Sequence, residues 1–166
     1  MNTQEYFKHF ELEVKKVYKI AEEARAKGLD PVNKVEIPLA MSMAEKVVGL
    51  VSTIYPQMEN SGIAKRILEL EETHGKLDPA VGVQIAEEVA KQKFCQFKSL
   101  LEAIEAGVRV GFAYATLGVV SSPIEGLTEI KIMKTLNGKE YFAPYYSGPV
   151  RSAGGTGAAF SLVLVD

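Results

Sequence analysis

Apolar residues in the first two thirds of the chain recur mainly at intervals of three and four positions, the spacing of one face of an α-helix. This pattern predicts four to five amphipathic helices, within residues 5–28, 38–55, 61–75, 77–94 and 97–117. Gly28 is the expected C-terminal cap of the first helix, and Ser61 the expected N-terminal cap of the third. Asp78 followed by Pro79 predicts the start of the fourth helix. The aspartate side chain accepts hydrogen bonds from the free N–H groups of the first turn, and proline, which has no N–H, is tolerated at the first helical position.

Two glycines, Gly107 and Gly111, interrupt the predicted helix at 97–117. Each lowers helix propensity by about 1 kcal/mol relative to alanine. The glycines therefore indicate either that this helix packs closely against a neighbour or that the helix signal is weaker in this segment.

Beyond residue 118 the pattern changes to alternation, which is typical of β-strands. Two such stretches, at 127–136 and 139–146, are separated by Asn137-Gly138, a pair that tolerates positive φ and is a strong hairpin signal. Pro144 restricts the second strand to an edge or an early end. We predict a β-hairpin here.

A glycine-rich stretch around Arg151 follows the hairpin and contains Gly148, Gly154, Gly155 and Gly157. Thr156 is the expected cap of a helix that starts near it, and a helix N-terminus preceded by glycines and an arginine favours anions. In the alternative interpretation, the glycines form a tight connection into a buried helix and Arg151 pairs with a carboxylate. Neither a P-loop nor a dinucleotide-binding glycine pattern is present.

The expected fold class is α+β and mostly helical, with a helical domain at 1–118 and a second region at 119–166. This second region contains the hairpin, the glycine-rich loop and a C-terminal element. The closing apolar run "AAFSLVLVD" has no helix-stop residue. We expect it to be a truncated element of a longer polypeptide, the alternative being a C-terminal strand or helix docked on the domain.

Composition narrows the function classes. The net charge of −2 and 24% charged residues leave no bulk basic signal for nucleic acid, so any polyanion contact must be local. A single cysteine, Cys95, fits a reducing cytosol, and no segment has the pattern of a signal peptide or membrane anchor. His9 and His74 are isolated, and no paired aspartates are spaced to hold magnesium, so no metal site or catalytic residue is expected.

Several motifs resemble one family of replicative enzymes. These are "ARAKGLDPVNKVEIPLA", "IAEEVA", "GVVSSPIEGLTEIKI" and "EYFAPYYSGPVRSAGGTGAAFSLVLVD", with the densest similarity in "SGPVRSAGGT". From Tyr6 to Asp166 the chain is similar to the start of the large subunit of the archaeal family D DNA polymerase. The resemblance implies a much longer parent polymerase with Mg²⁺ and Zn²⁺ sites downstream of residue 166. It also implies a small subunit with proofreading 3'-5' exonuclease activity, primer-template DNA as the substrate, and the archaeal cytosol as the location.

We therefore expect a non-catalytic N-terminal domain with a structural or assembly role and a possible contact to the DNA backbone. The candidate residues for DNA contact or for bracing the core are Arg151, Ser152, Gly154, Gly155, Thr156, Lys131, Lys134, Tyr145 and Tyr146. Exposed apolar residues near the C-terminus would also permit a homodimer of the isolated chain. The alternative function is a stand-alone helical interaction module whose glycine and arginine loop binds an anion.

Overall fold

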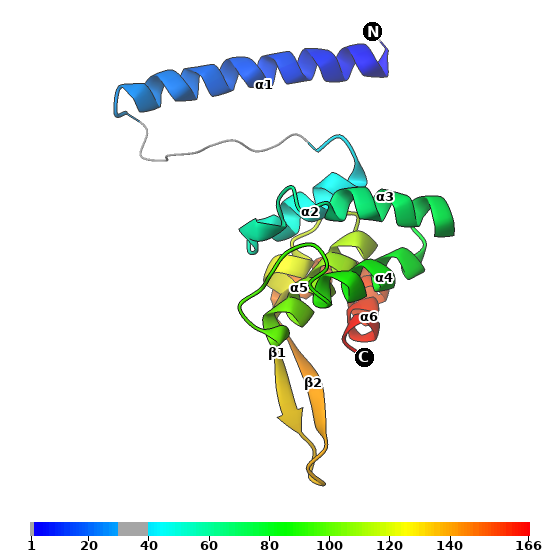
Figure 1. The fold of residues 1–166 in the computed structure, drawn as a ribbon. Coiled ribbons are helices and arrows are strands. Elements are labelled where there is room, and N and C mark those ends of the chain that lie inside the picture. Colours follow the sequence, from blue (N-terminus) through cyan, green and yellow to red (C-terminus); the bar gives the residue numbers. More distant parts are fainter. Residues whose placement is uncertain (1, 30–39) are drawn as a thin grey trace. The chain divides into compact units, whose positions relative to one another are not determined.

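The computed structural model describes residues 2–29 and 40–166 (Figure 1). The chain divides into two compact units, Met1–Leu39 and Ala40–Asp166, each described here by itself. The elements are α1 (Thr3–Ala26), α2 (Met43–Ser52), α3 (Ile63–His74), α4 (Pro79–Ala90), α5 (Leu100–Ala115), β1 (Leu127–Lys134), β2 (Glu140–Tyr146) and α6 (Gly154–Val165). The mostly helical α+β class is confirmed, whereas the predicted boundary after residue 118 stays a prediction.

The first unit consists of α1, which starts with a capping box. Asn2 Oδ1 accepts a hydrogen bond from the Glu5 N–H at 2.8 Å, and the Glu5 carboxylate accepts one from the Asn2 N–H at 2.9 Å. The helix ends at Ala26, and Gly28 follows with φ +69°, which confirms the predicted glycine cap. Within its own unit the apolar side chains of α1 stay largely exposed.

In the second unit, side chains upstream of each helix decide where it begins. Ser42 and Ser99 accept hydrogen bonds from the N–H groups of Glu45 and Glu102, so α2 and α5 start several residues later than the predicted 38 and 97. Residues 38 and 39 lie outside the described residues. The predicted Ser61 cap is wrong: α3 begins after Gly62, whose φ of +95° turns the chain, and Ser61 makes no capping bond.

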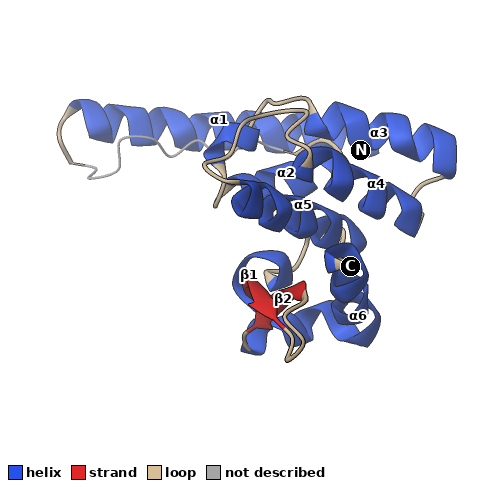
Figure 2. Ribbon diagram, turned by 60° about the horizontal axis from the view of Figure 1, so that its bottom comes forward, coloured by secondary structure: helices blue, strands red, loops and turns tan. Residues whose placement is uncertain are grey.

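The start of α4 agrees with the prediction. Asp78 Oδ1 accepts a hydrogen bond from the Ala80 N–H at 2.8 Å, and Pro79 occupies the first turn. Helices α2 to α5 enclose the main core (Figure 2). Its fully buried large side chains include Val47, Val51, Met58, Ile63, Ile67, Val81, Ile85, Val89, Val110 and Tyr114.

Helices α4 and α5 approach each other through glycine. A Cβ atom at Gly107 would lie 2.4 Å from the Ala86 carbonyl oxygen, and one at Gly111 would lie 2.7 Å from the Gly82 carbonyl oxygen. Such distances are shorter than van der Waals contact, so only glycine fits at this crossing. The predicted close packing of this helix is confirmed.

The predicted hairpin is also confirmed. Strands β1 and β2 pair antiparallel, with Ile132 opposite Phe142. The turn uses positive φ only at Gly138, and Thr135 donates its N–H to the Lys139 carbonyl oxygen at 2.9 Å. Asn137 keeps a negative φ, so the connection is a three-residue loop that ends in a left-handed glycine. In Figure 1 the hairpin extends away from the helices of residues 40–166.

An ion pair between α3 and α4 makes the stability of this unit dependent on pH. The Arg66 guanidinium donates to both carboxylate oxygens of Glu88 at 2.9 Å, and the Glu88 side chain is 7% exposed. The hydrogen bonds from Arg66 hold the pKa of Glu88 below its ordinary value of 4.5, assisted by the charges of Arg66 and Lys93. The folded state therefore binds a proton less readily than the unfolded state does.

We expect the stabilisation from this pair to be complete above about pH 5 and to be lost as the pH falls through the lowered pKa of Glu88. In Arg66→Gln that carboxyl loses its partner, so the free energy of unfolding should depend less steeply on pH in the acid range. Urea titrations from about pH 6 to about pH 3 measure this dependence. Lys65→Gln, which removes an exposed cation, should give a curve parallel to wild type. A parallel curve for Arg66→Gln as well would contradict the assignment.

Candidate functional site

The glycine-rich loop is a folded segment attached to the turn that precedes the hairpin. Residues Gly148–Ala153 form a 3₁₀-helix that leads directly into α6. The Ser122 hydroxyl lies 2.7 Å from the Ser152 hydroxyl, and both donate to the Pro149 carbonyl oxygen. The Ser147 N–H donates to the Gly126 carbonyl oxygen at 2.8 Å. These bonds give the loop a defined shape.

Arg151 lies exposed on this loop. Among residues 2–29 and 40–166 its guanidinium has no hydrogen bond or ion pair, and its carbonyl oxygen accepts the Gly154 N–H, so the predicted carboxylate partner is not found in the described part of the chain. The predicted Thr156 cap is wrong, because α6 begins at Gly154 and Thr156 falls within its first turn. Gly154, with φ +71°, makes the bend between the two helices.

The lysines of the hairpin have acidic neighbours. Lys131 Nζ lies 2.8 Å from the Glu129 carboxylate and 4.7 Å from the centre of the Tyr145 ring. Hydrogen bonding to Glu129, with the charge of that carboxylate, raises the pKa of Lys131. Lys134 Nζ lies 3.5 Å from the Glu140 carboxylate. Because both pairs are exposed, each contributes little to stability.

The two adjacent tyrosines have different environments. The Tyr146 hydroxyl is 2.7 Å from the buried Ser161 hydroxyl of α6, and its ring packs on a small cluster at the base of the hairpin. Tyr145 remains 39% exposed. Tyr146 therefore joins the hairpin to α6, and only Tyr145 offers a ring face to another molecule.

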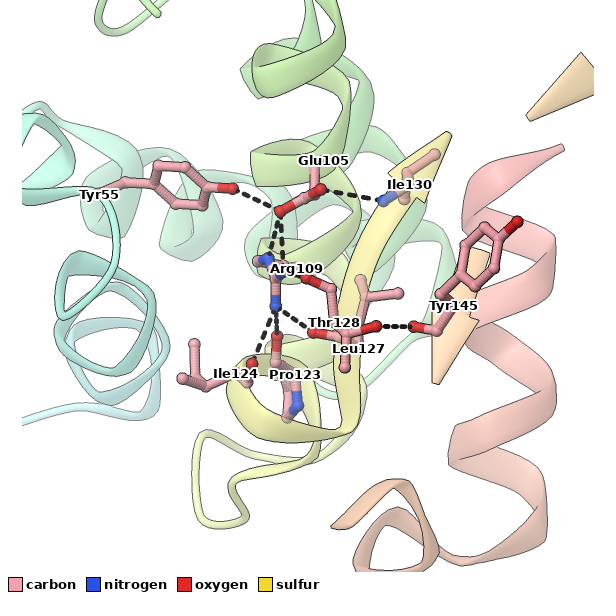
Figure 3. Close-up of polar contacts among 9 residues, drawn as sticks. All are labelled: Tyr55, Glu105, Arg109, Pro123, Ile124, Leu127, Thr128, Ile130 and Tyr145. Carbon is pink, nitrogen blue, oxygen red and sulfur yellow. Dashed lines mark hydrogen bonds and ion pairs between the residues drawn. The ribbon is translucent and has the colours of Figure 1, made fainter. Parts of the chain in front are cut away.

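Sequence reasoning missed a buried charged pair, Glu105 and Arg109 on α5 (Figure 3). Arg109 Nη2 lies 2.8 Å from Glu105 Oε1, and the Arg109 residue is 2% exposed. The guanidinium also donates to the carbonyl oxygens of Pro123, Ile124, Leu127 and Thr128 at 2.6–3.1 Å. Two opposite charges four positions apart, in a helix whose one other charged residue is Glu102 in the first turn, were the available signal.

Glu105 completes this network on its other side. Its carboxylate accepts a hydrogen bond from the Tyr55 hydroxyl at 2.9 Å and one from the Ile130 N–H at 3.0 Å. Burial of the phenol, together with the negative charge of Glu105, raises the pKa of Tyr55. The network therefore joins Tyr55, in the segment that follows α2, to the middle of α5 and the start of β1, and its polar atoms bond to one another and to the backbone (Figure 3).

The second unit also contains a mostly apolar hollow of about 300 Å³ beside the starts of α4 and α6. It is lined by Leu77, Pro79, Tyr114, Ala115, Leu117, Ala153, Thr156, Gly157 and Phe160. The Tyr114 hydroxyl donates to Glu71 and accepts from the Leu77 N–H, and burial raises the pKa of Tyr114 to about 12. This lining carries no charged side chain that could act as an acid, base or nucleophile.

The described residues, 2–29 and 40–166, contain neither a metal-ligand cluster nor a helix that could span a membrane. No three histidine, cysteine or acidic side chains there gather into a group that could hold a metal ion. No helix in these ranges is long and apolar enough to cross a bilayer. Most of the buried polar atoms have structural partners, whereas Arg151 and the outer part of the hairpin face outward.

The fold and its contacts define a mostly helical domain whose buried charges hold its elements together. A family model described as DNA polymerase II large subunit DP2, N-terminal, matches residues 5–166. The chain is 45% identical to the DNA polymerase II large subunit of Nanoarchaeum equitans, over 97% of this chain and 13% of that protein. It is 42% identical to that of Methanococcoides burtonii (98% and 13%) and 41% identical to that of Pyrococcus abyssi (98% and 11%).

The chain therefore belongs to the DNA polymerase II large subunit family and corresponds to the N-terminal region of that family. It spans only about an eighth of the length of these relatives. The family resemblance predicted from the sequence is confirmed.

Proposed function

We propose that this chain is the non-catalytic N-terminal domain of the large subunit of an archaeal replicative DNA polymerase, where it has a structural and assembly role. The observation that carries the proposal is the match of nearly the whole chain to one end of much longer polymerase subunits. The polymerase chemistry, with its Mg²⁺ and Zn²⁺ sites, then belongs to the remaining part of the subunit. The proposed partners are a small exonuclease subunit and primer-template DNA, in the archaeal cytosol.

The acidic residues of the second unit support a non-catalytic role. The buried Glu88 carboxylate pairs with Arg66, the half-buried Glu105 carboxylate pairs with Arg109, and Glu71 accepts a hydrogen bond from the Tyr114 hydroxyl. A two-metal polymerase centre needs carboxylates that converge on a common point and remain free to bind magnesium. These three acids instead lie on three different helices, and each is bound by a group of the same domain.

A domain deletion tests the assembly role. The large subunit lacking residues 2–166 should be purified with its small subunit and compared with the intact complex for complex formation, primer binding and primer extension. We expect the deletion to weaken complex formation or primer binding. Primer extension should fall only as a consequence. Unchanged assembly and DNA binding would rule out the role. Loss of extension with both of them intact would indicate direct participation in catalysis.

Arg151 is the best candidate for a phosphate contact, because it is exposed on a well-defined loop and has no partner in the described part of the chain. Loss of one cation–phosphate contact reduces the salt dependence of binding by about one unit of slope. In the intact polymerase, Arg151→Ala should therefore weaken primer-template binding at low salt and give a shallower plot of affinity against salt.

Arg151→Lys, which keeps the charge, is the matched control and should retain the wild-type slope. Fluorescence anisotropy at several salt concentrations measures both variants. The same slope for Arg151→Ala and wild type would assign Arg151 to a contact within the polymerase instead of to DNA.

A further inference from the structure

We propose that the hairpin β1–β2 inserts into a cleft formed by the part of the same large subunit that follows residue 166, so that both of its faces become buried. This inference rests on the proposed assembly role and identifies the surface that performs it. It concerns the outer half of the hairpin, from Lys131 to Ala143, which the helices of this unit do not cover.

Exposed apolar side chains lie on both faces of the outer hairpin. Directly paired residues share a face and successive residues alternate, so Ile132 and Phe142 lie on one face and Met133 and Tyr141 on the other. These four side chains are 38–51% exposed. At the tip, Leu136 is fully exposed. Each face also carries one exposed ion pair, Lys134 with Glu140 or Lys131 with Glu129, but neither face is polar throughout, as one face of a solvated hairpin would be.

The hairpin is joined to the rest of its unit only at the base. The Ile130 N–H donates to Glu105, the Thr128 carbonyl oxygen accepts from Arg109, and the Tyr146 hydroxyl bonds to Ser161. Among the described residues, no hydrogen bond of the outer half reaches another element. Because an isolated two-stranded hairpin is only marginally stable in water, the outer half needs a second surface.

The chemistry of this surface favours a protein partner over nucleic acid. Both lysines of β1, Lys131 and Lys134, already have an acidic neighbour, Glu129 and Glu140. Nucleic acid binding draws mainly on cations that are free to meet phosphates. Aromatic residues and methionine with few unpaired charges are instead typical of the buried core of protein interfaces.

Two features point to the same subunit as the partner. The relatives are about eight times longer than this chain, so most of the surface of a full-length subunit lies in its remaining part. That part is covalently linked, which gives it a high effective concentration at the hairpin. A second copy of the hairpin packed face to face would cover only one of the two faces.

Photo-crosslinking in the intact polymerase tests this proposal. Benzoylphenylalanine is placed at Tyr141 or at Phe142, neighbours in sequence on opposite faces of the same strand. After irradiation with and without primer-template, crosslinked peptides are identified by mass spectrometry. We expect both positions to crosslink to peptides of the same large subunit beyond residue 166, whether or not DNA is present.

Other crosslinking patterns overturn the proposal. Crosslinks from only one of the two positions would mean docking on a flat surface. Crosslinks to DNA, to the small subunit or to a second large subunit would assign the hairpin to that partner. An absence of crosslinks at both positions would mean that the hairpin stays exposed. Crosslinking does not depend on polymerase activity or on the result of the domain deletion. If the deletion left assembly and DNA binding unchanged, the proposed function would be refuted, and the crosslinks would still show where the hairpin lies.

A substitution gives an independent check. Phe142→Asp places a charge in the proposed cleft and leaves the base contacts of the hairpin untouched. In the full-length subunit we expect trypsin to cleave at Lys139, beside the tip, about tenfold faster than in wild type, because the hairpin would spend more time released. Glu140→Asp, which changes an exposed acid conservatively, is the control. Equal cleavage rates for Phe142→Asp and wild type would contradict insertion.

Discussion

Arg109→Met is expected to lower the free energy of unfolding of this chain by about 3–5 kcal/mol, the usual cost of breaking a buried ion pair by removing one partner. Methionine fills much of the same volume but donates no hydrogen bonds. The Glu105 carboxylate would lose its cation, and the carbonyl oxygens at 123–128 would lose their shared donor. Urea unfolding followed by circular dichroism measures the loss.

The matched control for this prediction is Lys76→Met, the same kind of change at an exposed position. Surface substitutions usually alter stability by less than about 0.5 kcal/mol. If Arg109→Met were as mild as Lys76→Met, the network in Figure 3 would not be what joins the hairpin to α5. The double variant Glu105→Gln/Arg109→Met should recover part of the loss, because the uncompensated carboxylate is then removed.

Gly107→Ala is expected to destabilise the chain by about 1–3 kcal/mol, the typical cost of overpacking. Helix propensity alone predicts the opposite sign, a gain of about 1 kcal/mol when alanine replaces glycine within a helix. The new Cβ would lie 2.4 Å from the Ala86 carbonyl oxygen, which belongs to the backbone of α4 and cannot turn away. Helices α4 and α5 would have to separate.

Gly49→Ala provides the comparison with the opposite expected sign. Gly49 lies on the exposed face of α2, and no atom lies within 4 Å of where its Cβ would be. Here propensity acts alone, so alanine should stabilise the chain by roughly 0.5–1 kcal/mol. Thermal or urea unfolding of both variants measures the difference. A gain of stability in Gly107→Ala would refute the close crossing of α4 and α5.

The errors in the sequence predictions concern helix starts. Ser61 and Thr156 have the right chemistry for caps, yet Gly62 and Gly154 turn the chain at those points. Ser42 and Ser99 are the caps that are used, and they shorten the predicted helices at 38–55 and 97–117. Several residues near each start could cap equally well by composition. Which of them does depends on the backbone angles that packing allows.

The candidate site was predictable only in part. The position of the loop and its exposed Arg151 follow from a glycine-rich segment between a hairpin and an apolar helix. The different environments of Tyr145 and Tyr146 do not follow from the sequence. Tyr146 bonds to Ser161 because α6 packs beside the base of β2, whereas Tyr145 stays accessible. The spacing of four residues weakly indicated a pair between Glu105 and Arg109. Nothing in the sequence indicated the hydroxyl, N–H and carbonyl groups that bind this pair.

The sequence by itself determined the helical class, the α4 start at Asp78-Pro79, the hairpin around Asn137-Gly138 and the family. Each of these depends on residues a few positions apart, or on a continuous string of matching residues. The tertiary structure alone decided that Arg109 reaches the Thr128 carbonyl and that Glu105 reaches the Ile130 N–H. Such contacts join residues 19 and 25 positions apart, and packing of α5 against the base of the hairpin is what brings them within hydrogen-bond distance.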